Sequence, residues 1–310
     1  MSKKMLAFLS ISMALVANLA QAAIYDRKGN KLPDEAVNSS AVDWELLTAQ
    51  NSKNYNGIGL FEKAGEGFCT AFFLNTKGDD NAPAYAVTNG HCAVLPAFPK
   101  ATEIITNRPS ELVFKLNYFV NSKSLVRTLP IRQIVYATMK GTDITVFELG
   151  TTFKQLVKAG FTPLEIDTLP ANLGEPVQVV GIPGAGVQRS LRYLHKAVCK
   201  AGQSVNLNED VYQWQNAVRH RCSAVGGMSG SPMISQKTNR VVAIVNTGVD
   251  DQALKQPECS WDRPCEVSNS GKKSTLPNEN YAQRVNAIPT CFDQKGVFNL
   301  NLAGCKLEKP

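Results

Sequence analysis

Residues 226–232 are Gly-Gly-Met-Ser-Gly-Ser-Pro, and this stretch, centred on Ser229, decides how the rest of the chain is interpreted. A lone serine in a glycine-rich run is most often part of a turn, because glycine adopts positive φ and serine caps backbone groups. A serine that acts as a nucleophile needs a base within hydrogen-bond reach, because its hydroxyl is weakly nucleophilic at neutral pH. Ser229 is therefore a candidate nucleophile only if the chain supplies that base.

A candidate base lies far upstream, in the segment Thr-Asn-Gly-His-Cys at residues 88–92. His91 is one of only three histidines in the chain. Such a base is oriented by a third group, usually a carboxylate, and Asp143 in Gly-Thr-Asp-Ile-Thr-Val at residues 141–146 is the natural candidate. An isolated aspartate before an apolar run would be a surface residue, but the order His, Asp, Ser occurs in catalytic triads. The conjunction of the three segments predicts nucleophilic acyl transfer.

The N-terminal residues 1–22 have the three parts of a secretory signal peptide. Two lysines precede a largely apolar run at residues 5–16, and Ala-Gln-Ala at 20–22 forms a small-residue cleavage site. The apolar run is shorter than the ~20 residues that cross a bilayer. We therefore expect a mature chain that begins near Ala23 and is secreted or periplasmic.

The formal charge of the sequence is +7, and the loss of Lys3 and Lys4 with the signal peptide would lower it by two. No dense basic run with interleaved aromatic residues occurs, so the charge indicates a solvated, mildly basic surface. With 310 residues and 44% hydrophobic content, the chain can bury a large core, and its length favours two domains. We expect a monomer without a nucleic-acid partner or stable membrane association.

The cysteines are even in number and all follow the predicted signal peptide, which indicates disulfide bonds in an exported chain. Metal binding is the alternative, but the sequence has no Cys-x-x-Cys pair and no neighbouring histidine cluster. We therefore expect no metal. The number of possible pairings is too large for the sequence alone to choose among them. The eight residues are Cys69, Cys92, Cys199, Cys222, Cys259, Cys265, Cys291 and Cys305.

Short apolar or alternating runs of strand length fill most of the chain after residue 56. Clusters of Gly, Asn, Asp and Pro separate these runs, a pattern typical of an all-β sandwich or barrel. The runs form two groups of similar size, which predicts two β domains. They lie at 57–61, 69–74, 84–88, 111–119, 125–136 and 143–149, and then at 175–182, 190–198, 211–219, 232–235 and 240–247.

Few segments have a helical pattern. Residues 42–47 follow Ser39 and Ser40, which are suitable caps, so a short helix is expected there. Residues 151–160 are expected to form a helical connection and residues 279–288 a short C-terminal helix. The polar residues between the last strand and that helix are expected to form a long loop.

The segments around His91, Asp143 and Ser229 resemble those of the trypsin-like (chymotrypsin-fold) serine peptidases, and especially their bacterial branch, which includes the glutamyl endopeptidases. Each segment is a weak signal alone, but the three together at compatible spacing are specific. The resemblance covers about residues 57–288 and implies two six-stranded antiparallel β-barrels with the active site in the cleft between them.

The resemblance divides the chain as follows. A lead-in at 23–56 follows the signal peptide, the first barrel covers 57–166, the second barrel covers 167–288, and a disulfide-closed tail covers 289–310.

The resemblance also implies a mechanism for hydrolysis of polypeptide substrates. Ser229 would attack the peptide carbonyl while His91 takes its proton, and Asp143 would orient the imidazole and stabilise the imidazolium. The backbone N–H groups of Gly227 and Ser229 would form the oxyanion hole. No cofactor or metal is required by this chemistry.

Two disulfide bonds are implied by the resemblance, Cys69–Cys92 beside the histidine and Cys199–Cys222 before the nucleophile. The other two bonds, Cys259–Cys265 and Cys291–Cys305, are expected only because their members are close in sequence. A different pairing, such as Cys222 with Cys259 across the pocket entrance, stays open.

One position departs from the digestive members of the family, which have an aspartate immediately before the nucleophile. That aspartate pairs with the new N-terminus on activation, and here the position is Met228. The same ion pair therefore cannot form. We expect that removal of the signal peptide is sufficient for activity, or that any propeptide acts sterically.

The preferred substrate side chain is left open by the sequence. Relatives that cleave after Arg or Lys have an acid at the floor of the pocket, and here that position is Ser223. Glutamate-specific relatives usually have a histidine in the strand after the nucleophile, and this strand has none here. Asp250 and Asp251 are alternatives for binding a basic side chain, although a solvated loop is their ordinary environment. We expect His195 and His220 to be structural or exposed. The candidate pocket residues are Ser223, Ala224, Asn246, Thr247 and Gly248.

Two other functions compete with the peptidase. A non-catalytic binding protein can have the same fold, since a fold does not determine function. An α/β-hydrolase esterase needs Gly-x-Ser-x-Gly, but residue 231 is Ser231 and the order of the triad differs.

Overall fold

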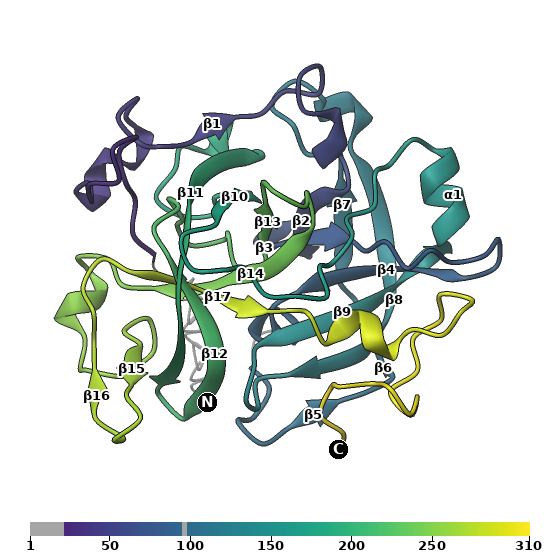
Figure 1. Ribbon diagram of the computed structural model, residues 1–310. Coiled ribbons are helices and arrows are strands. Elements are labelled where there is room, and N and C mark those ends of the chain that lie inside the picture. The colour runs from purple at the N-terminus through teal and green to yellow at the C-terminus, as the bar shows by residue number, and fades with distance from the viewer. Residues whose placement is uncertain (1–21, 95–97) are drawn as a thin grey trace, which may run out of the picture.

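The computed structural model describes residues 22–94 and 98–310. It consists of two β-sheets packed side by side, with few helices (Figure 1). The predicted signal peptide lies outside the described residues, apart from Ala22. No helix of the described residues is long and apolar enough to cross a membrane.

The first sheet is a closed barrel. Six strands follow the order β8-β7-β2-β3-β4-β9, and β8 also pairs with β9, which closes the ring. Two short strands, β5 and β6, extend β8 at one edge. The strands are β2 (Ile58–Lys63), β3 (Glu66–Phe73), β4 (Pro83–Thr88), β5 (Ile104–Ile105), β6 (Arg108–Pro109), β7 (Val113–Leu116), β8 (Arg127–Thr138) and β9 (Ile144–Thr152).

The second sheet closes in the same way. Its order is β10-β13-β14-β17-β12-β11, and β10 also pairs with β11. Three short strands, β1, β15 and β16, extend β11. The strands are β1 (Glu45–Leu46), β10 (Pro176–Gly181), β11 (His195–Glu209), β12 (Tyr212–His220), β13 (Pro232–Ser235), β14 (Val241–Gly248), β15 (Cys265–Val267), β16 (Lys273–Ser274) and β17 (Asn280–Arg284). The all-β, chymotrypsin-like fold is therefore confirmed.

Aromatic side chains fill the interior of the first barrel. Phe61, Phe114 and Phe147 are completely buried, and the rings of Phe61 and Phe147 lie 4.6 Å apart between centroids. Each comes from a different strand and occupies an inward-facing position. Burial of three such side chains stabilises the barrel by several kcal/mol, at about 2 kcal/mol each, and so provides a rigid support for the loops at its end.

The prediction of a helix at 42–47 is wrong. Residues Asp34–Asn38 form a short 3-10 helix instead, and β1 takes the place of the expected helix. Leu46 pairs with His195 of β11, and Leu47 is fully buried and donates its N–H to Leu194 O at 2.9 Å. Pairing with a sheet edge satisfies this backbone better than one isolated turn of helix.

The prediction of a C-terminal helix at 279–288 is also wrong. Residues Asn280–Arg284 form β17, which lies between β12 and β14 and closes the second barrel. Four of its five residues are buried, so a helix would have left both neighbouring strands unpaired. A short 3-10 helix, Ile288–Cys291, follows it.

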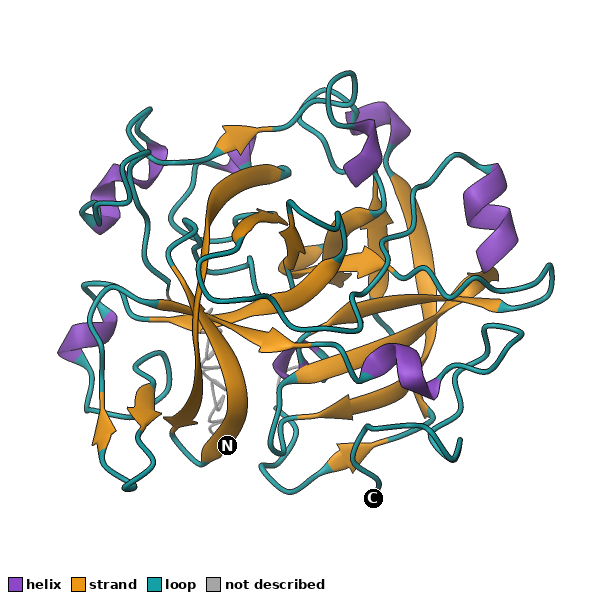
Figure 2. Ribbon diagram, in the orientation of Figure 1, coloured by secondary structure: helices purple, strands orange, loops and turns teal. Residues whose placement is uncertain are grey.

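The helical connection expected at 151–160 is confirmed as α1, Phe153–Lys158 (Figure 2). Its first turn is capped by Thr152, whose side chain accepts from Gln155 N at 3.3 Å. The remaining 3-10 helices of the described residues are Lys53–Tyr55, Gly90–Cys92, Lys123–Leu125, Arg189–Leu191 and Ala253–Lys255.

The C-terminal tail returns from the second barrel to the first (Figure 1). Phe292 packs on Tyr85 of β4 with 5.0 Å between ring centroids. Phe298 N donates to the Tyr85 hydroxyl at 3.2 Å, and the Cys291–Cys305 disulfide closes the tail. The tail thus connects the two barrels on one side.

Candidate active site

His91 and Asp143 form two hydrogen bonds with each other. The ring Nδ1 of His91 lies 2.7 Å from Asp143 Oδ2, and the backbone N–H of His91 donates to Asp143 Oδ1 at 2.8 Å. Asp143 is completely buried, and His91 is nearly so. Because both carboxylate oxygens bind the same residue, Asp143 fixes the position of the His91 backbone as well as the orientation of its ring.

The pairing of β4 with β9 brings these residues together. Thr88, at the end of β4, pairs with Thr145 near the start of β9. Asn89 then donates its side-chain N–H to Asp143 O at 2.9 Å. The next residue has to be glycine, because a Cβ on Gly90 would lie 2.1 Å from Thr138 O. The Asn-Gly-His order is thus required by close packing against β8 and Asp143.

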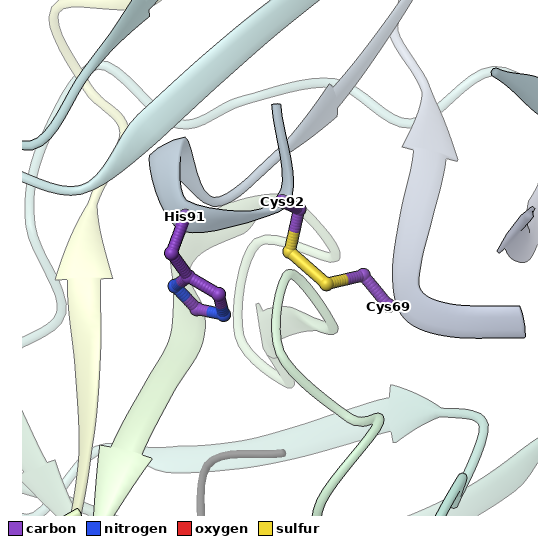
Figure 3. A group of neighbouring side chains, drawn as sticks. All are labelled: Cys69, His91 and Cys92. Atoms are coloured by element: carbon purple, nitrogen blue, oxygen red, sulfur yellow. A yellow bond between two sulfur atoms is a disulfide. The ribbon is translucent and has the colours of Figure 1, made fainter. Parts of the chain in front are cut away.

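A disulfide bond holds the histidine-bearing turn from the other side. Cys92 is bonded to Cys69 of β3, and the imidazole of His91 projects from the same turn next to that bond (Figure 3). The three residues have the donor atoms of a metal site within 4.8 Å of one another. Both sulfurs are committed to the disulfide, however, so no thiolate is available as a metal ligand.

The segment around Ser229 is a tight turn between Cys222 and β13. Gly227 has φ of +92°, and a Cβ there would lie 2.4 Å from Gly184 N. Gly230 has φ of +81°, and a Cβ there would lie 2.2 Å from Thr70 O. Both glycines are therefore required by conformation and by close approach of other backbone.

The backbone N–H groups of this turn differ in whether they donate a hydrogen bond within the protein. Met228 N donates to Val225 O at 3.0 Å, and Gly230 N donates to Val245 O at 2.8 Å. Within residues 22–94 and 98–310, the N–H groups of Gly227 and Ser229 donate no hydrogen bond. The two N–H groups predicted for the oxyanion hole are thus the ones left available for a ligand.

Thr70 joins the segment around Ser229 to the segment around His91, and no sequence motif had indicated it. Thr70 N donates to Ser229 O at 2.8 Å, and its hydroxyl lies 3.3 Å from Gly227 O and accepts from Ile182 N at 3.0 Å. The preceding residue, Cys69, carries the disulfide to Cys92. A continuous chain of bonds therefore runs from Ser229 to the residue after His91.

The structure thus brings His91 and Asp143 into direct contact, and it places Ser229 in the turn between β12 and β13 of the second barrel. The Ser229 hydroxyl forms no hydrogen bond with any residue in the described part of the chain.

A family profile for a trypsin-like peptidase domain matches residues 69–244, which is more than half of the chain. The chain belongs to the trypsin-like peptidase family. It is therefore a serine endopeptidase of the trypsin-like class. A comparison with curated protein sequences finds no match to this chain.

The chain is also similar to several solved structures at low sequence identity. The chain is 10% identical to neuropsin, a serine protease from mouse brain, with a TM-score of 0.48 and coverage of 78% of this chain and 93% of that one. It is 15% identical to a Glu endopeptidase, with a TM-score of 0.43 and coverage of 78% and 90%. It is 16% identical to the protease Anisep from Arthrobacter nicotinovorans, with a TM-score of 0.45 and coverage of 74% and 90%.

The predicted pocket residues of the peptidase are all buried, and the N-terminal segment lies against them. Tyr25 N donates to Ser223 Oγ at 2.8 Å, and Ala224 N donates to Ala23 O at 3.2 Å. A Cβ on Gly248 would lie 2.9 Å from the Cα of Ala22. The candidates Ser223, Ala224 and Gly248 thus share one environment, to which residues 22–25 contribute.

Asn280 also belongs to this environment, although no sequence motif had indicated it. Its side-chain oxygen accepts from Ala23 N at 2.7 Å, and its side-chain N–H groups donate to the carbonyls of Ala23 and Cys222, each at 2.9 Å. A Cβ on Gly248 would lie 2.3 Å from the same oxygen. Asn280 was assigned to an expected helix, so its place beside Gly248 in the sheet could not be anticipated.

The two aspartates considered for binding a basic side chain have other partners. Asp251 forms an ion pair with Lys31 at 2.5 Å. Asp250 is buried and accepts from Ala253 N at 2.7 Å, and burial raises the pKa of its carboxyl. Each therefore has a structural role in the loop that follows β14.

The remaining cysteines are paired as expected, in the bonds Cys199–Cys222, Cys259–Cys265 and Cys291–Cys305. His220 lies beside the first of these bonds, which also excludes those sulfurs as thiolate ligands. Both His195 and His220 are buried, and burial lowers the pKa of each imidazole, to about 3 for His220.

Proposed function

We propose that this serine endopeptidase cleaves peptide bonds through an acyl-enzyme intermediate on Ser229, with His91 as the base and Asp143 as the orienting carboxylate. The observation that carries the proposal is the double contact of Asp143 with the ring and the backbone of His91. A carboxylate that accepts from Nδ1 keeps the proton on that nitrogen and leaves Nε2 with its lone pair. His91 can then take a proton only through Nε2.

The reaction then proceeds in two stages. As Ser229 Oγ attacks the carbonyl carbon, its proton passes to His91 Nε2, and Asp143 stabilises the imidazolium. The imidazolium protonates the leaving amine, and a water molecule hydrolyses the ester by the reverse sequence. The free N–H groups of Gly227 and Ser229 would bind the oxyanion, at about 3–4 kcal/mol for each donor.

The same proposal includes an exported, monomeric enzyme that acts on polypeptides, with a mature chain that begins near Ala23. Four disulfide bonds support an oxidising compartment, the periplasm or the outside of the cell. The burial of Ala23 against the pocket residues supports removal of the preceding segment. N-terminal sequencing of the active enzyme tests this; a start well beyond Ala23 would contradict it.

Incubation of the mature protein with a peptide library tests the catalytic proposal. We expect cleavage by the parent and a loss of at least about a thousand-fold in the Ser229→Ala variant, which lacks the nucleophile. Ser231→Ala, two residues away, is the matched control and should retain activity. Equal cleavage by the Ser229→Ala variant would contradict the assignment. A correctly folded parent that binds peptides without cleaving them would favour the binding protein considered above.

A further inference from the structure

The peptide group that joins Gly226 to Gly227 is held in one orientation by the loop that follows β10, residues 182–188. Gly226 O accepts from Gly184 N at 2.7 Å and from Ala185 N at 3.0 Å. In a planar trans peptide group the C=O and the N–H point in opposite directions. Two donors on the Gly226 oxygen therefore direct the Gly227 N–H to the side that faces away from this loop.

The reversed orientation of this peptide group would be unfavourable. It would break both hydrogen bonds to Gly226 O and place a carbonyl oxygen where the Gly227 N–H now points. Close packing adds to this, because a Cβ on Gly184 would lie 3.1 Å from Gly227 Cα, and a Cβ on Gly227 would lie 2.5 Å from Gly184 Cα. The backbone of the loop thus determines where the Gly227 N–H points.

The N-terminal lead-in holds this loop in place. Asn38 is the last residue of the 3-10 helix Asp34–Asn38. Its side-chain N–H donates to Gly186 O at 3.1 Å, and its side-chain oxygen accepts from Gln188 N at 3.1 Å. One amide side chain therefore binds two backbone groups of the loop. Asn38 is itself exposed, so its replacement leaves no cavity in the core.

Apolar packing joins the lead-in to the same region. Val37 is buried in one cluster with Val187 of the loop, and Val225 packs against this cluster. Val225 directly precedes Gly226 in the sequence, and its carbonyl accepts from Met228 N at 3.0 Å. The lead-in thus supports the turn around Ser229 both through the loop and through Val225.

Met228 contributes packing but no charge at the centre of this turn. It is completely buried, and a Cβ on Gly181 would lie 3.2 Å from its Cε. An ion pair at the residue before Ser229 cannot form in this chain, because that residue is apolar. Neutral hydrogen bonds and apolar contacts therefore have to orient the turn.

We propose that residues 34–38 act as a brace for the proposed oxyanion hole, with Asn38 as its positioning residue. Asn38 holds the loop, the loop holds Gly226 O, and the Gly227 N–H is thereby directed at the oxygen that becomes negative in the transition state. The proposal rests on the proposed function, since the direction of this N–H affects the reaction only if Ser229 attacks a carbonyl.

Steady-state kinetics of the mature enzyme on a peptide that it cleaves tests the proposal. Asn38→Ala should lower kcat by about ten-fold or more and leave KM within about two-fold, because the oxyanion forms only in the transition state. Removal of a whole oxyanion donor costs about a hundred- to a thousand-fold in kcat, which is the upper limit of the effect. Gly184→Ala should show the same pattern, since its Cβ would press on Gly227 Cα.

Inhibition by a peptide aldehyde separates the brace from a general loss of structure. The Ser229 hydroxyl adds across the aldehyde C=O, and the oxygen of the resulting hemiacetal takes the place of the oxyanion. The affinity for the aldehyde should fall by the same factor as kcat/KM. The pH at which kcat/KM is half-maximal should not move, because His91 and Asp143 keep both of their hydrogen bonds.

Asn30→Ala is the matched control and should have parental values. Asn30 lies in the same lead-in, and its side chain donates to Asp26 Oδ2 at 2.9 Å rather than to the loop. Thermal unfolding shows whether each variant is folded. If Asn38→Ala does not fold, Gly184→Ala decides.

A folded Asn38→Ala variant with the parental kcat, or with a raised KM alone, would overturn the brace. The loss of cleavage in Ser229→Ala would still support the proposed function in that case. If the parent cleaves no peptide, the proposed function fails, and the brace fails with it.

Discussion

Thr70 shows how one side chain can align two halves of a site. Its hydroxyl lies between the backbones of Gly227 and Ile182, both in the second barrel, while its own backbone belongs to β3 of the first. Thr88 adds a hydrogen bond from its hydroxyl to Thr70 O at 2.7 Å. Small polar side chains at the junction therefore connect the turn around Ser229 to β3 and β4 of the first barrel.

Replacement of Thr70 by valine tests this role. The change keeps the shape of the side chain but removes the hydroxyl, and it leaves the buried Ile182 N–H without a partner. We expect the free energy of unfolding to fall by about 1–3 kcal/mol and kcat to fall further than KM rises. Chemical denaturation and steady-state kinetics measure the two effects. Thr70→Ser is the matched control and should restore both; a Thr70→Val enzyme with parental values would contradict the role.

Site residues could be predicted from the sequence where a short sequence motif marks them, and could not be predicted where only distant contacts do. His91 and Asp143 stand in short segments whose chemistry is evident from sequence, and the structure places them in contact. Thr70 and Asn280 lack such signals, because their importance comes from contacts with residues that are more than 100 positions away. A threonine in a strand and an asparagine at a strand end are ordinary until the fold brings their partners close.

Among the elements, strands were predicted better than helices. The alternation of apolar residues identified most strands of both barrels, but β17 was mistaken for a helix, since its five residues are too few to show a period. The error matters because β17 carries Asn280 and lies between β12 and β14. A strand that is buried on both faces gives no alternation, so only the sheet itself reveals it.

His220 makes β12 sensitive to acid. Burial lowers the pKa of its imidazole from 6.5 to about 3, so the ring is neutral in the folded protein while the unfolded chain binds a proton below pH 6.5. The stability that depends on this neutral ring is present above pH 6.5 and is lost as the pH falls towards 3. At pH 4 the loss amounts to about 3 kcal/mol.

The variant His220→Leu should remove this part of the pH dependence. Its free energy of unfolding, measured with urea at several pH values, should fall less than that of the parent between pH 7 and pH 4. The value at pH 7 serves as the internal reference for any packing defect of the variant. Parallel pH profiles for the two proteins would show that His220 does not carry the effect.

At the scale of the whole molecule, the two barrels are joined at several places. The parallel bridge between Ile166 and Val241 joins the segment that follows α1 to β14, and a second parallel bridge joins Gly141 to Trp214 of β12. The C-terminal tail adds a third connection by packing on Tyr85 of the first barrel. The relative placement of the barrels thus depends on segments far from Ser229 in sequence.

The disulfide of the tail should contribute to the stability of this assembly. Cys291 and Cys305 enclose a separation of 14 residues, whereas Cys259 and Cys265 enclose a separation of six. By the loop-entropy estimate, replacing both cysteines by serine should cost about 3 kcal/mol for the first pair and about 2 kcal/mol for the second. Thermal unfolding of the two double variants gives the comparison. A tail variant as stable as the parent would indicate that packing alone holds the tail.

The burial of Ala23 has a practical consequence for preparation of the enzyme. Its backbone N–H is hydrogen-bonded to Asn280 and it is fully buried, so the residue ahead of it lies against the candidate pocket residue Gly248. An affinity tag or an initiator methionine joined directly to Ala23 would therefore disturb the packing around Gly248. Pro310, in contrast, is exposed, and a purification tag attached after it leaves the surroundings of Ala23 unchanged.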